Sequence, residues 1–186
     1  ILVMSAVGSY NGLVNRDQAV DAAWAQVENV YQRRADLVPN LVRTVSGAAD
    51  FEKSTLTAVT EARASVGQIK LPEGTAPTDP AALARFEQAQ GQLGSALSRL
   101  MVVVERYPEL RATQAFRDLQ VQLEGTENRI AVERGRYNAI VQDYNSAIRR
   151  VPGALYASIF GFDKKAYFSA EAGAEKAPVV DFGGKS

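Results

Sequence analysis

The chain has 186 residues, a length that favours one domain, and its formal net charge of +0 argues against a nucleic-acid-binding protein, which needs a concentrated basic face. It contains no cysteine and no histidine, which excludes disulfide frameworks, thiol chemistry, most zinc sites and the commonest general base. We therefore expect no catalytic, cofactor-binding or metal-binding residues, and we do not expect an enzyme.

The first residues form an apolar segment. Ile1 to Val7 resembles the last third of a transmembrane helix, which needs about 20 apolar residues, and Tyr10 follows where an aromatic anchor would meet the membrane surface. The alternative is a short apolar leader that packs on the domain. We divide the chain into the remnant of a transmembrane helix (1–9), a helical bundle (10–168) and a flexible C-terminal tail (169–186).

A heptad pattern predicts the first long helix, from about Leu13 to Val66. Two rows of residues spaced by seven fall on one face of this helix, and most of their members are apolar. The rows consist of Val20, Val27, Arg34, Leu41 and Ala48, and of Trp24, Tyr31, Val38, Val45 and Glu52.

Prolines divide the rest of the chain. A linker (67–80) leads to a second helix that begins at Pro80, is capped by Asp79 and ends near Tyr107, where Pro108 forces a corner. A third helix is predicted over 109–150, and a short fourth over 152–161. The predicted fold is all-α: a long antiparallel up-and-down helical bundle, with three long helices plus a short fourth, following an N-terminal transmembrane segment.

Charged residues interrupt the apolar seams: Arg34 and Glu52 in the first helix, Glu127 and Arg134 in the third. A buried charge without a partner is costly, so we expect the pairs Arg34–Glu127 and Glu52–Arg134. Arg34 and Glu52 are 18 residues apart but Glu127 and Arg134 are 7 apart, so only one direct pair forms unless a helix bends. We interpret this polar seam as a device that fixes register rather than as an active site.

A proline supplies such a bend. Pro39 lies inside the first helix, where it removes one backbone hydrogen bond and crowds the carbonyl of Ala35. Asp36 and Asn40 flank the proline, and we expect their side chains to satisfy the freed backbone groups.

Two further sets of charges each allow two interpretations. Glu124, Glu127 and Glu133 form either a cation or acid/base site or, as we favour, solvated and ion-paired side chains. Arg149 and Arg150 either contact anionic lipid or nucleic acid or, as we favour, balance the partial negative charge at a helix C-terminus.

Aromatic residues near the C-terminus are similarly ambiguous. Lys164 and Lys165 lie among phenylalanines that either touch a membrane surface or, as we favour, attach the short fourth helix to the bundle. Two Tyr-Asn pairs, one heptad apart on the seam, suggest either a ligand site or core tyrosines with hydrogen-bonded hydroxyls, which we favour. The pairs are Tyr137–Asn138 and Tyr144–Asn145.

Several motifs in a fixed order carry a family resemblance. They are YNGLV, QRRADLVPNLVRTV, ERYPELRATQAFRDLQ, EGTENRI, RGRYNAIVQDYN and a late GF. With these motifs the chain resembles the LemA family from Tyr10 to about Phe168. The resemblance implies a membrane protein with one N-terminal transmembrane helix and a long helical bundle, and it implies no established reaction.

Together these observations predict a membrane-anchored, non-catalytic helical scaffold or interaction protein that self-associates. Because the first helix overhangs the second, we expect an exposed stripe of Val20, Trp24 and Val27 to form a homo-oligomer, unless the third helix covers it and the protein is a monomer. The alternatives are an accessory or regulatory subunit of a membrane enzyme, and a small-molecule or cation binder using the polar seam.

The expected partners are membrane lipid, through the N-terminal segment, further copies of the chain, and an unidentified membrane protein, with no nucleic acid and no cofactor. We expect a single-pass protein of the bacterial inner (cytoplasmic) membrane. Only Arg16 and Asp17 follow the apolar segment closely, without a basic cluster, which favours an extracytoplasmic (periplasmic) bundle.

Overall fold

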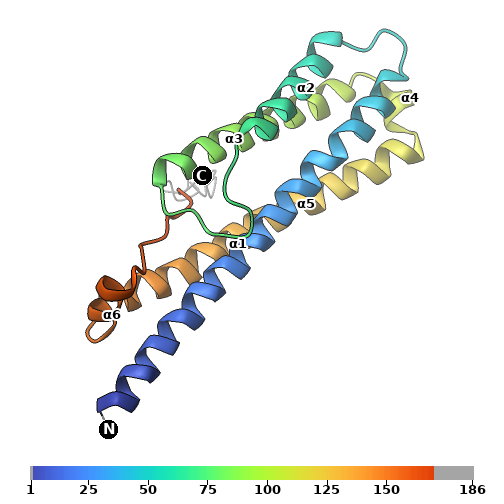
Figure 1. Cartoon of the computed structure of the whole chain (residues 1–186). Helices are drawn as coiled ribbons and strands as arrows, with labels where there is room; N and C mark the ends of the chain where they lie inside the picture. Colours follow the sequence, from blue (N-terminus) through green and yellow to red (C-terminus); the bar gives the residue numbers. More distant parts are fainter. Residues whose placement is uncertain (1, 170–186) are drawn as a thin grey trace, which may run out of the picture.

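A computed structural model describes residues 2–169, and each regular element in that range is a helix (Figure 1). The helices are α1 (Leu2–Ser46), α2 (Lys53–Gln68), α3 (Pro80–Val104), α4 (Pro108–Arg111), α5 (Gln114–Ala147) and α6 (Gly153–Phe160). α1 and α5 run antiparallel as one long pair, and α2 and α3 form a second, shorter antiparallel pair on one end of it. The predicted antiparallel, all-α, up-and-down bundle is confirmed for the described residues.

The prediction of one helix from about Leu13 to Val66 is wrong, because the chain reverses between α1 and α2. Asp50 adopts a left-handed conformation with φ of 60°, and the following residue, Phe51, is buried and packs its ring against Tyr107 at 4.9 Å. A residue at positive φ cannot continue a right-handed helix, so Asp50 keeps α1 and α2 apart, and the buried Phe51 ring fixes the reversal. The bundle therefore has four long helices in place of the predicted three.

The proline boundaries lie where the sequence places them. Asp79 caps α3 by accepting a hydrogen bond from the Ala81 amide at 2.9 Å, with Pro80 in the first turn. Pro108 begins α4, which together with α5 replaces the third predicted helix. The break between them follows from Thr113, whose hydroxyl caps α5 by accepting from the Phe116 amide at 3.3 Å.

The core consists of two apolar clusters separated by a polar layer. On α1, one cluster ends at Tyr31 and the other begins at Val38, and Arg34 lies between them. The same change occurs on α5, where Ile130 and Leu123 belong to different clusters. The first cluster lies between α1 up to Tyr31 and α5 from Ile130 onward, and it also includes Leu83 of α3 and residues of the two extended segments. The second cluster lies between the remaining parts of α1 and α5, α2 and α3.

The described residues contain little of the two terminal segments predicted from the sequence, the transmembrane helix and the flexible tail. Within residues 2–169, no helix is apolar over a sufficient length to cross a bilayer, so the predicted N-terminal transmembrane segment is not supported there. The predicted flexible tail lies outside the described residues, apart from Ser169. Ser169 donates hydrogen bonds from its amide and its hydroxyl to Glu87 of α3.

Candidate functional site

The polar layer centres on Arg34, whose side chain is 4% exposed. One terminal nitrogen donates to both carboxylate oxygens of Glu127 at 3.2 Å, and the other donates to the carbonyl and the side-chain oxygen of Gln90. The guanidinium also lies 5.1 Å from the centre of the Tyr31 ring. Arg34 of α1 thus binds α5 and α3 at once, which fixes the register of three helices.

The expected pair Arg34–Glu127 is therefore present, whereas the expected pair Glu52–Arg134 is wrong. Glu52 pairs with Arg106 at 2.9 Å, and Arg134 pairs with Glu87 at 2.9 Å. The reason is the reversal after α1, which carries Glu52 to the far end of the bundle. Hydrogen bonds from Ser54 and Arg106 lower the pKa of the Glu52 carboxyl.

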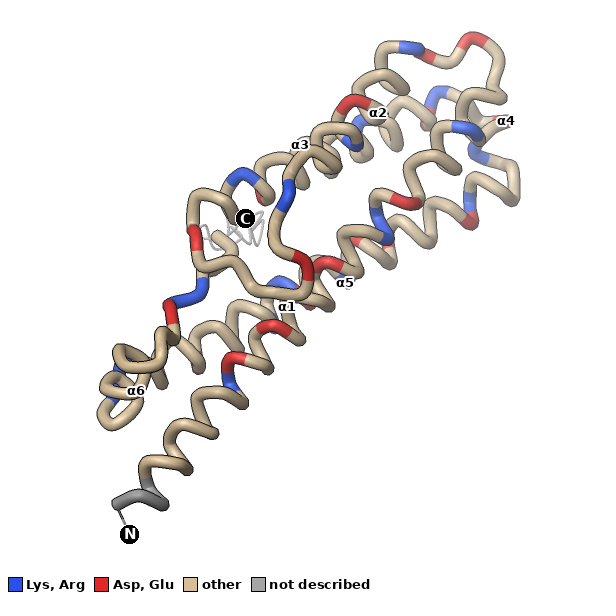
Figure 2. Tube along the Cα trace, viewed as in Figure 1, with Lys and Arg blue, Asp and Glu red and all other residues tan. Residues whose placement is uncertain are grey.

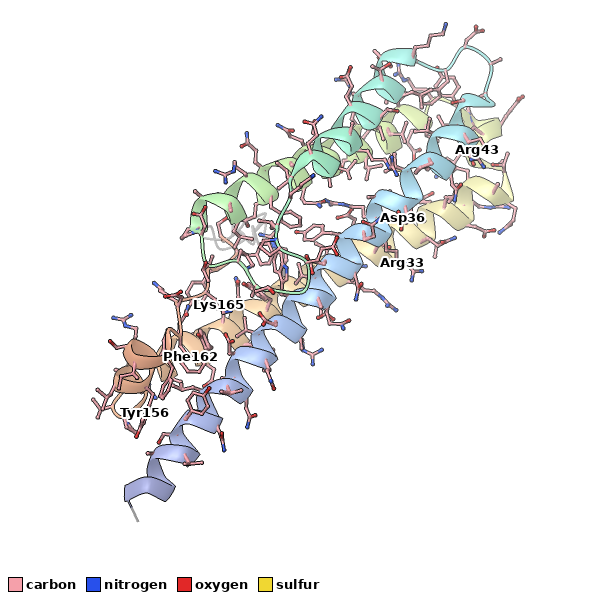
Figure 3. All side chains as sticks on the ribbon, viewed as in Figure 1. Arg33, Asp36, Arg43, Tyr156, Phe162 and Lys165 are labelled. Carbon is pink, nitrogen blue, oxygen red and sulfur yellow. The ribbon has the colours of Figure 1, made fainter. Side chains whose placement is uncertain are left out.

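The backbone carbonyl freed by Pro39 is satisfied from another helix. α1 continues past Pro39, and Arg63 of α2 donates from Nε to the carbonyl oxygen of Ala35 at 3.0 Å. The expectation that Asp36 and Asn40 would satisfy this carbonyl is wrong. Both are exposed, and Asp36 accepts from Gln32 at 2.8 Å instead (Figure 3). The proline therefore links α1 to α2 through an arginine.

A groove of about 640 Å³ lies over the polar layer between α3 and α5. Its charged lining residues, which are Arg34, Glu87, Glu127 and Arg134, bind one another in pairs across it. Among residues 2–169 there is no cluster of three or more side chains that is arranged to hold a metal ion. Of the acidic set noted in the sequence, Glu124 accepts from Gln120 at 2.9 Å.

The two Tyr-Asn pairs of α5 bind the backbone of an extended segment, residues 163–169, which we call the clasp. The Asn145 side chain donates to the Lys165 carbonyl at 2.9 Å and accepts from the Lys165 amide at 3.0 Å. The Asn138 side chain likewise donates to the Phe168 carbonyl at 3.0 Å and accepts from the Phe168 amide at 2.9 Å. Each amide side chain thus reproduces the two-way hydrogen bonding of a neighbouring β-strand.

The tyrosines complete the recognition of the clasp. Tyr144 donates to the Asp163 carbonyl at 3.0 Å, and Tyr137 donates to the Ala166 carbonyl at 3.1 Å. This confirms the interpretation of both as core tyrosines with bonded hydroxyls. Burial raises the pKa of each phenol above its ordinary value, with Asp21 adding to the effect at Tyr137.

Helix and clasp match in spacing. One heptad of helix rises about 10.5 Å, and three residues of extended chain span about 10 Å. The contacts of the two Tyr-Asn pairs are accordingly seven residues apart on α5 and three residues apart on the clasp. A repeated Tyr-Asn pair on a helix can therefore bind the backbone of an antiparallel extended peptide, independently of the side chains of that peptide.

Two clasp side chains add sequence-specific contacts. Lys165 lies 3.0 Å from an oxygen of Asp17 and 3.7 Å from one of Asp21, and its side chain is 8% exposed (Figure 3). The Phe168 ring stacks on Trp24 at 5.9 Å, and the Arg134 guanidinium lies 4.9 Å from its centre. Lys165 and Phe168 thus attach the clasp to α1 and α5, and α3 holds its last residue through Glu87.

The clasp also overturns the predicted oligomer stripe. Val20, Trp24 and Val27 are each 0% exposed, so no apolar stripe is available there for a second copy. α5 covers one side of these residues, and the clasp, the linker before α3 and α3 itself cover the rest.

Exposed apolar side chains gather instead at the end of the bundle where α1 begins and α6 packs. We call this surface the apolar end; it comprises Val7, Tyr10, Val151, Leu155, Ile159 and Phe160. The Tyr10 and Phe160 rings lie 4.8 Å apart, which joins α1 to α6, and Tyr156 and Phe162 lie beside them (Figure 3). No residue of α6 is fully buried, although the helix is wholly apolar apart from one serine and the Tyr156 hydroxyl.

Basic residues border the apolar end. Arg149, Arg150 and Lys164 line one depression of about 340 Å³, together with Tyr167. The first part of α1 carries no charge before Arg16 (Figure 2). An apolar surface next to exposed cations resembles the interfacial surfaces of proteins that lie on anionic membranes.

Comparison with known proteins gives one family. A model described as the LemA family matches residues 23–182. The magnetosome protein MamQ of Magnetospirillum gryphiswaldense is 29% identical over 86% of this chain and 64% of its own length. MamQ 2 of Paramagnetospirillum magneticum is 29% identical over 92% and 68%, and protein LemA of Metamycoplasma hominis is 24% identical over 76% and 60%. The chain thus spans slightly less than two thirds of the first of these relatives.

Proposed function

Because the chain belongs to the LemA family, we propose that it is a membrane-associated, non-catalytic helical scaffold that stands on a bilayer surface by its apolar end. The observation that carries this proposal is the gathering of exposed apolar side chains at one end of an elongated bundle. In the proposed arrangement, α6 lies in the interface and the four-helix region extends away from the membrane.

The free energy that the apolar end and its basic residues would gain at a membrane is large enough for binding. Leu155, Ile159 and Phe160 are 61%, 62% and 56% exposed. Transferring the exposed part of each into lipid is worth about 1 kcal/mol, and each basic side chain near an anionic surface adds about 1 kcal/mol. Together these terms give roughly 5–6 kcal/mol, enough for reversible binding of a helix at an interface.

The polar groups of the bundle support a structural role rather than a chemical one. Arg34 donates to both Glu127 and Gln90 in the polar layer, and Arg134 binds Glu87. Charges that neutralise each other inside a bundle hold its helices in place, which supports a structural role for this layer.

Flotation with lipid vesicles tests the membrane contact. The double variant Leu155→Gln, Ile159→Gln changes only half-exposed side chains of α6, so the bundle should keep its helical circular dichroism. Losing about 2 kcal/mol should lower partitioning into vesicles with anionic lipid by roughly 30-fold. The matched control is Val121→Gln, Val132→Gln on α5, where the side chains are 67% and 64% exposed but lie away from the apolar end.

A second arm separates charge from apolar contact. Changing Arg149, Arg150 and Lys164 to Gln should weaken binding to anionic vesicles and leave the weak binding to neutral phosphatidylcholine vesicles unchanged. Equal flotation of the α6 variant and the α5 control would overturn the proposal that α6 meets the membrane.

A further inference from the structure

The clasp is held as a bound peptide is held. Within the described chain, the contacts of residues 163–169 go to α1, α3, α5 and the linker, with Ala166 donating from its amide to Pro77 at 2.9 Å. The surface that holds the clasp, which we call the clasp groove, is distinct from the groove over the polar layer. It binds the main chain of the clasp through Asn138 and Asn145, and it binds two side chains, a lysine and a phenylalanine three residues later. It is therefore a complete site for an extended Lys-x-x-Phe peptide.

The segment that connects α5 to the clasp, residues 149–161, includes α6 and buries little of its own surface on the bundle. α6 has no fully buried residue, and Gly161 after it has φ of 72°, a left-handed conformation that glycine adopts without strain. The clasp, by contrast, buries Lys165, Ala166 and Phe168. If α6 leaves its position, it gives up the packing of Tyr156 and Ala157 on the first core cluster and the contact of Phe160 with Tyr10, but no fully buried side chain of its own. Every contact of the clasp can be remade on an identical surface of another copy.

The connection also reaches a neighbouring molecule. Residues 149–161 comprise α6, which spans about 12 Å as a helix, and non-helical residues that extend by about 3.3 Å each. Together they cover roughly 28 Å without unfolding α6. Adjacent helices pack about 8–10 Å apart, so a neighbouring bundle presents its clasp groove within roughly 20–30 Å.

We propose that the clasp groove takes the clasp of a second copy, so that two molecules exchange residues 163–169 and form a symmetric dimer. The occupant must offer a lysine, a phenylalanine three residues later and free amides at both positions, and a second copy offers all of these. Exchange of an identical element costs little because both arrangements contain the same contacts. The inference rests on the proposed function, since attachment to one membrane raises the local concentration of copies.

Cross-linking between two singly substituted copies tests the exchange. Ser146 of α5 and Tyr167 of the clasp line the same depression, and Tyr167 is 42% exposed. Because the chain has no cysteine, Ser146→Cys and Tyr167→Cys each introduce one thiol. Copies of the two variants, distinguished by a size tag, are mixed on vesicles and in concentrated solution, incubated below the unfolding temperature and treated with a short bismaleimide.

If the clasps exchange, the cross-linked heterodimer between Cys-substituted positions 146 and 167 should exceed the background several-fold. A mixture of Asp36→Cys and Tyr167→Cys copies measures this background, because Asp36 is exposed on α1 and does not contact the clasp. Adding Asn145→Ala to the Ser146→Cys copy should reduce the heterodimer, since that copy then lacks the main-chain contacts of an acceptor.

The double variant Ser146→Cys, Tyr167→Cys provides the opposite reference, because a clasp that stays in its own clasp groove links within the monomer. Complete linking within this monomer, together with only background heterodimer on vesicles and in solution, would overturn the exchange whether or not the protein floats with lipid. Flotation without heterodimer would leave the membrane contact standing and remove the exchange alone.

Discussion

Replacing Asn145 with alanine should release the clasp. The Asn145 side chain satisfies both backbone groups of Lys165, and the two residues are 3% and 7% exposed. In Asn145→Ala, a buried amide and a buried carbonyl lose their partners, at about 1–3 kcal/mol each. Some water will reach the clasp, so we expect a total loss of about 2–4 kcal/mol.

Two measurements separate local from global effects. If the clasp opens before the bundle unfolds, the amides of Lys165 and Phe168 should exchange with solvent roughly 30- to 700-fold faster, which is the rate equivalent of that energy. The fluorescence of Trp24, the single tryptophan of the chain, should change at the same time because its ring stacks on Phe168. Urea unfolding then gives the share of the loss that reaches the whole bundle.

The matched control is Asn128→Ala, which changes the same residue type on the same helix at an exposed position. It should cost less than about 0.5 kcal/mol and leave the clasp amides protected. If Asn145→Ala resembles this control in both exchange and unfolding, then the side-chain ladder does not hold the clasp, and the peptide-like recognition inferred from the geometry is wrong.

Two further predictions concern the polar layer and the buried phenols. Glu127→Gln leaves the buried guanidinium of Arg34 without its counter-charge and should cost about 2 kcal/mol in urea unfolding, because the Glu127 side chain is itself 42% exposed. The double variant with Arg34→Ala should cost less than the sum of the single variants by at least about 1 kcal/mol. Strict additivity would show that the pair is not coupled. Because burial raises the pKa of Tyr137, the unfolded chain loses this proton first above about pH 10, so the free energy of unfolding should fall by up to about 1.4 kcal/mol per pH unit. Tyr137→Phe should reduce this alkaline slope, and a slope equal to that of the unsubstituted protein would contradict the assignment.

Much of the fold could be predicted from local sequence. Helical periodicity, the Asp79–Pro80 start of α3 and the corner at Pro108 depend on interactions within a few residues, and each lies where predicted. The pairing of Arg34 with Glu127 could also be predicted, because a buried cation needs a counter-charge and few acidic residues interrupt a seam.

The reversal after Ser46 could not be read from periodicity. The heptad rows of α1 continue through the reversal to Ala48 and Glu52, and α2 after it also has an apolar face. The apolar pattern therefore gives no sign that the helix ends at Ser46. Contacts between residues far apart in the chain favour two helices over one: Phe51 packs against Tyr107, whose hydroxyl donates to the Asp50 carbonyl at 3.0 Å, and Glu52 pairs with Arg106. The same reversal brings Arg63 to the carbonyl of Ala35 and takes Glu52 away from Arg134.

The sequence by itself determined that most of the described chain is helical and which faces of the helices are apolar, because both follow from contacts within one or two turns, but it did not show the reversal between α1 and α2. Only the tertiary structure decided what covers those faces. Val20, Trp24 and Val27 read as an exposed stripe, yet α5 and the clasp bury them. The clasp has no periodic pattern of its own, and its backbone hydrogen bonds go to distant residues, among them Asn138 and Asn145, 20 to 30 residues away. A segment whose conformation depends on such distant partners becomes ordered only when the helices have assembled.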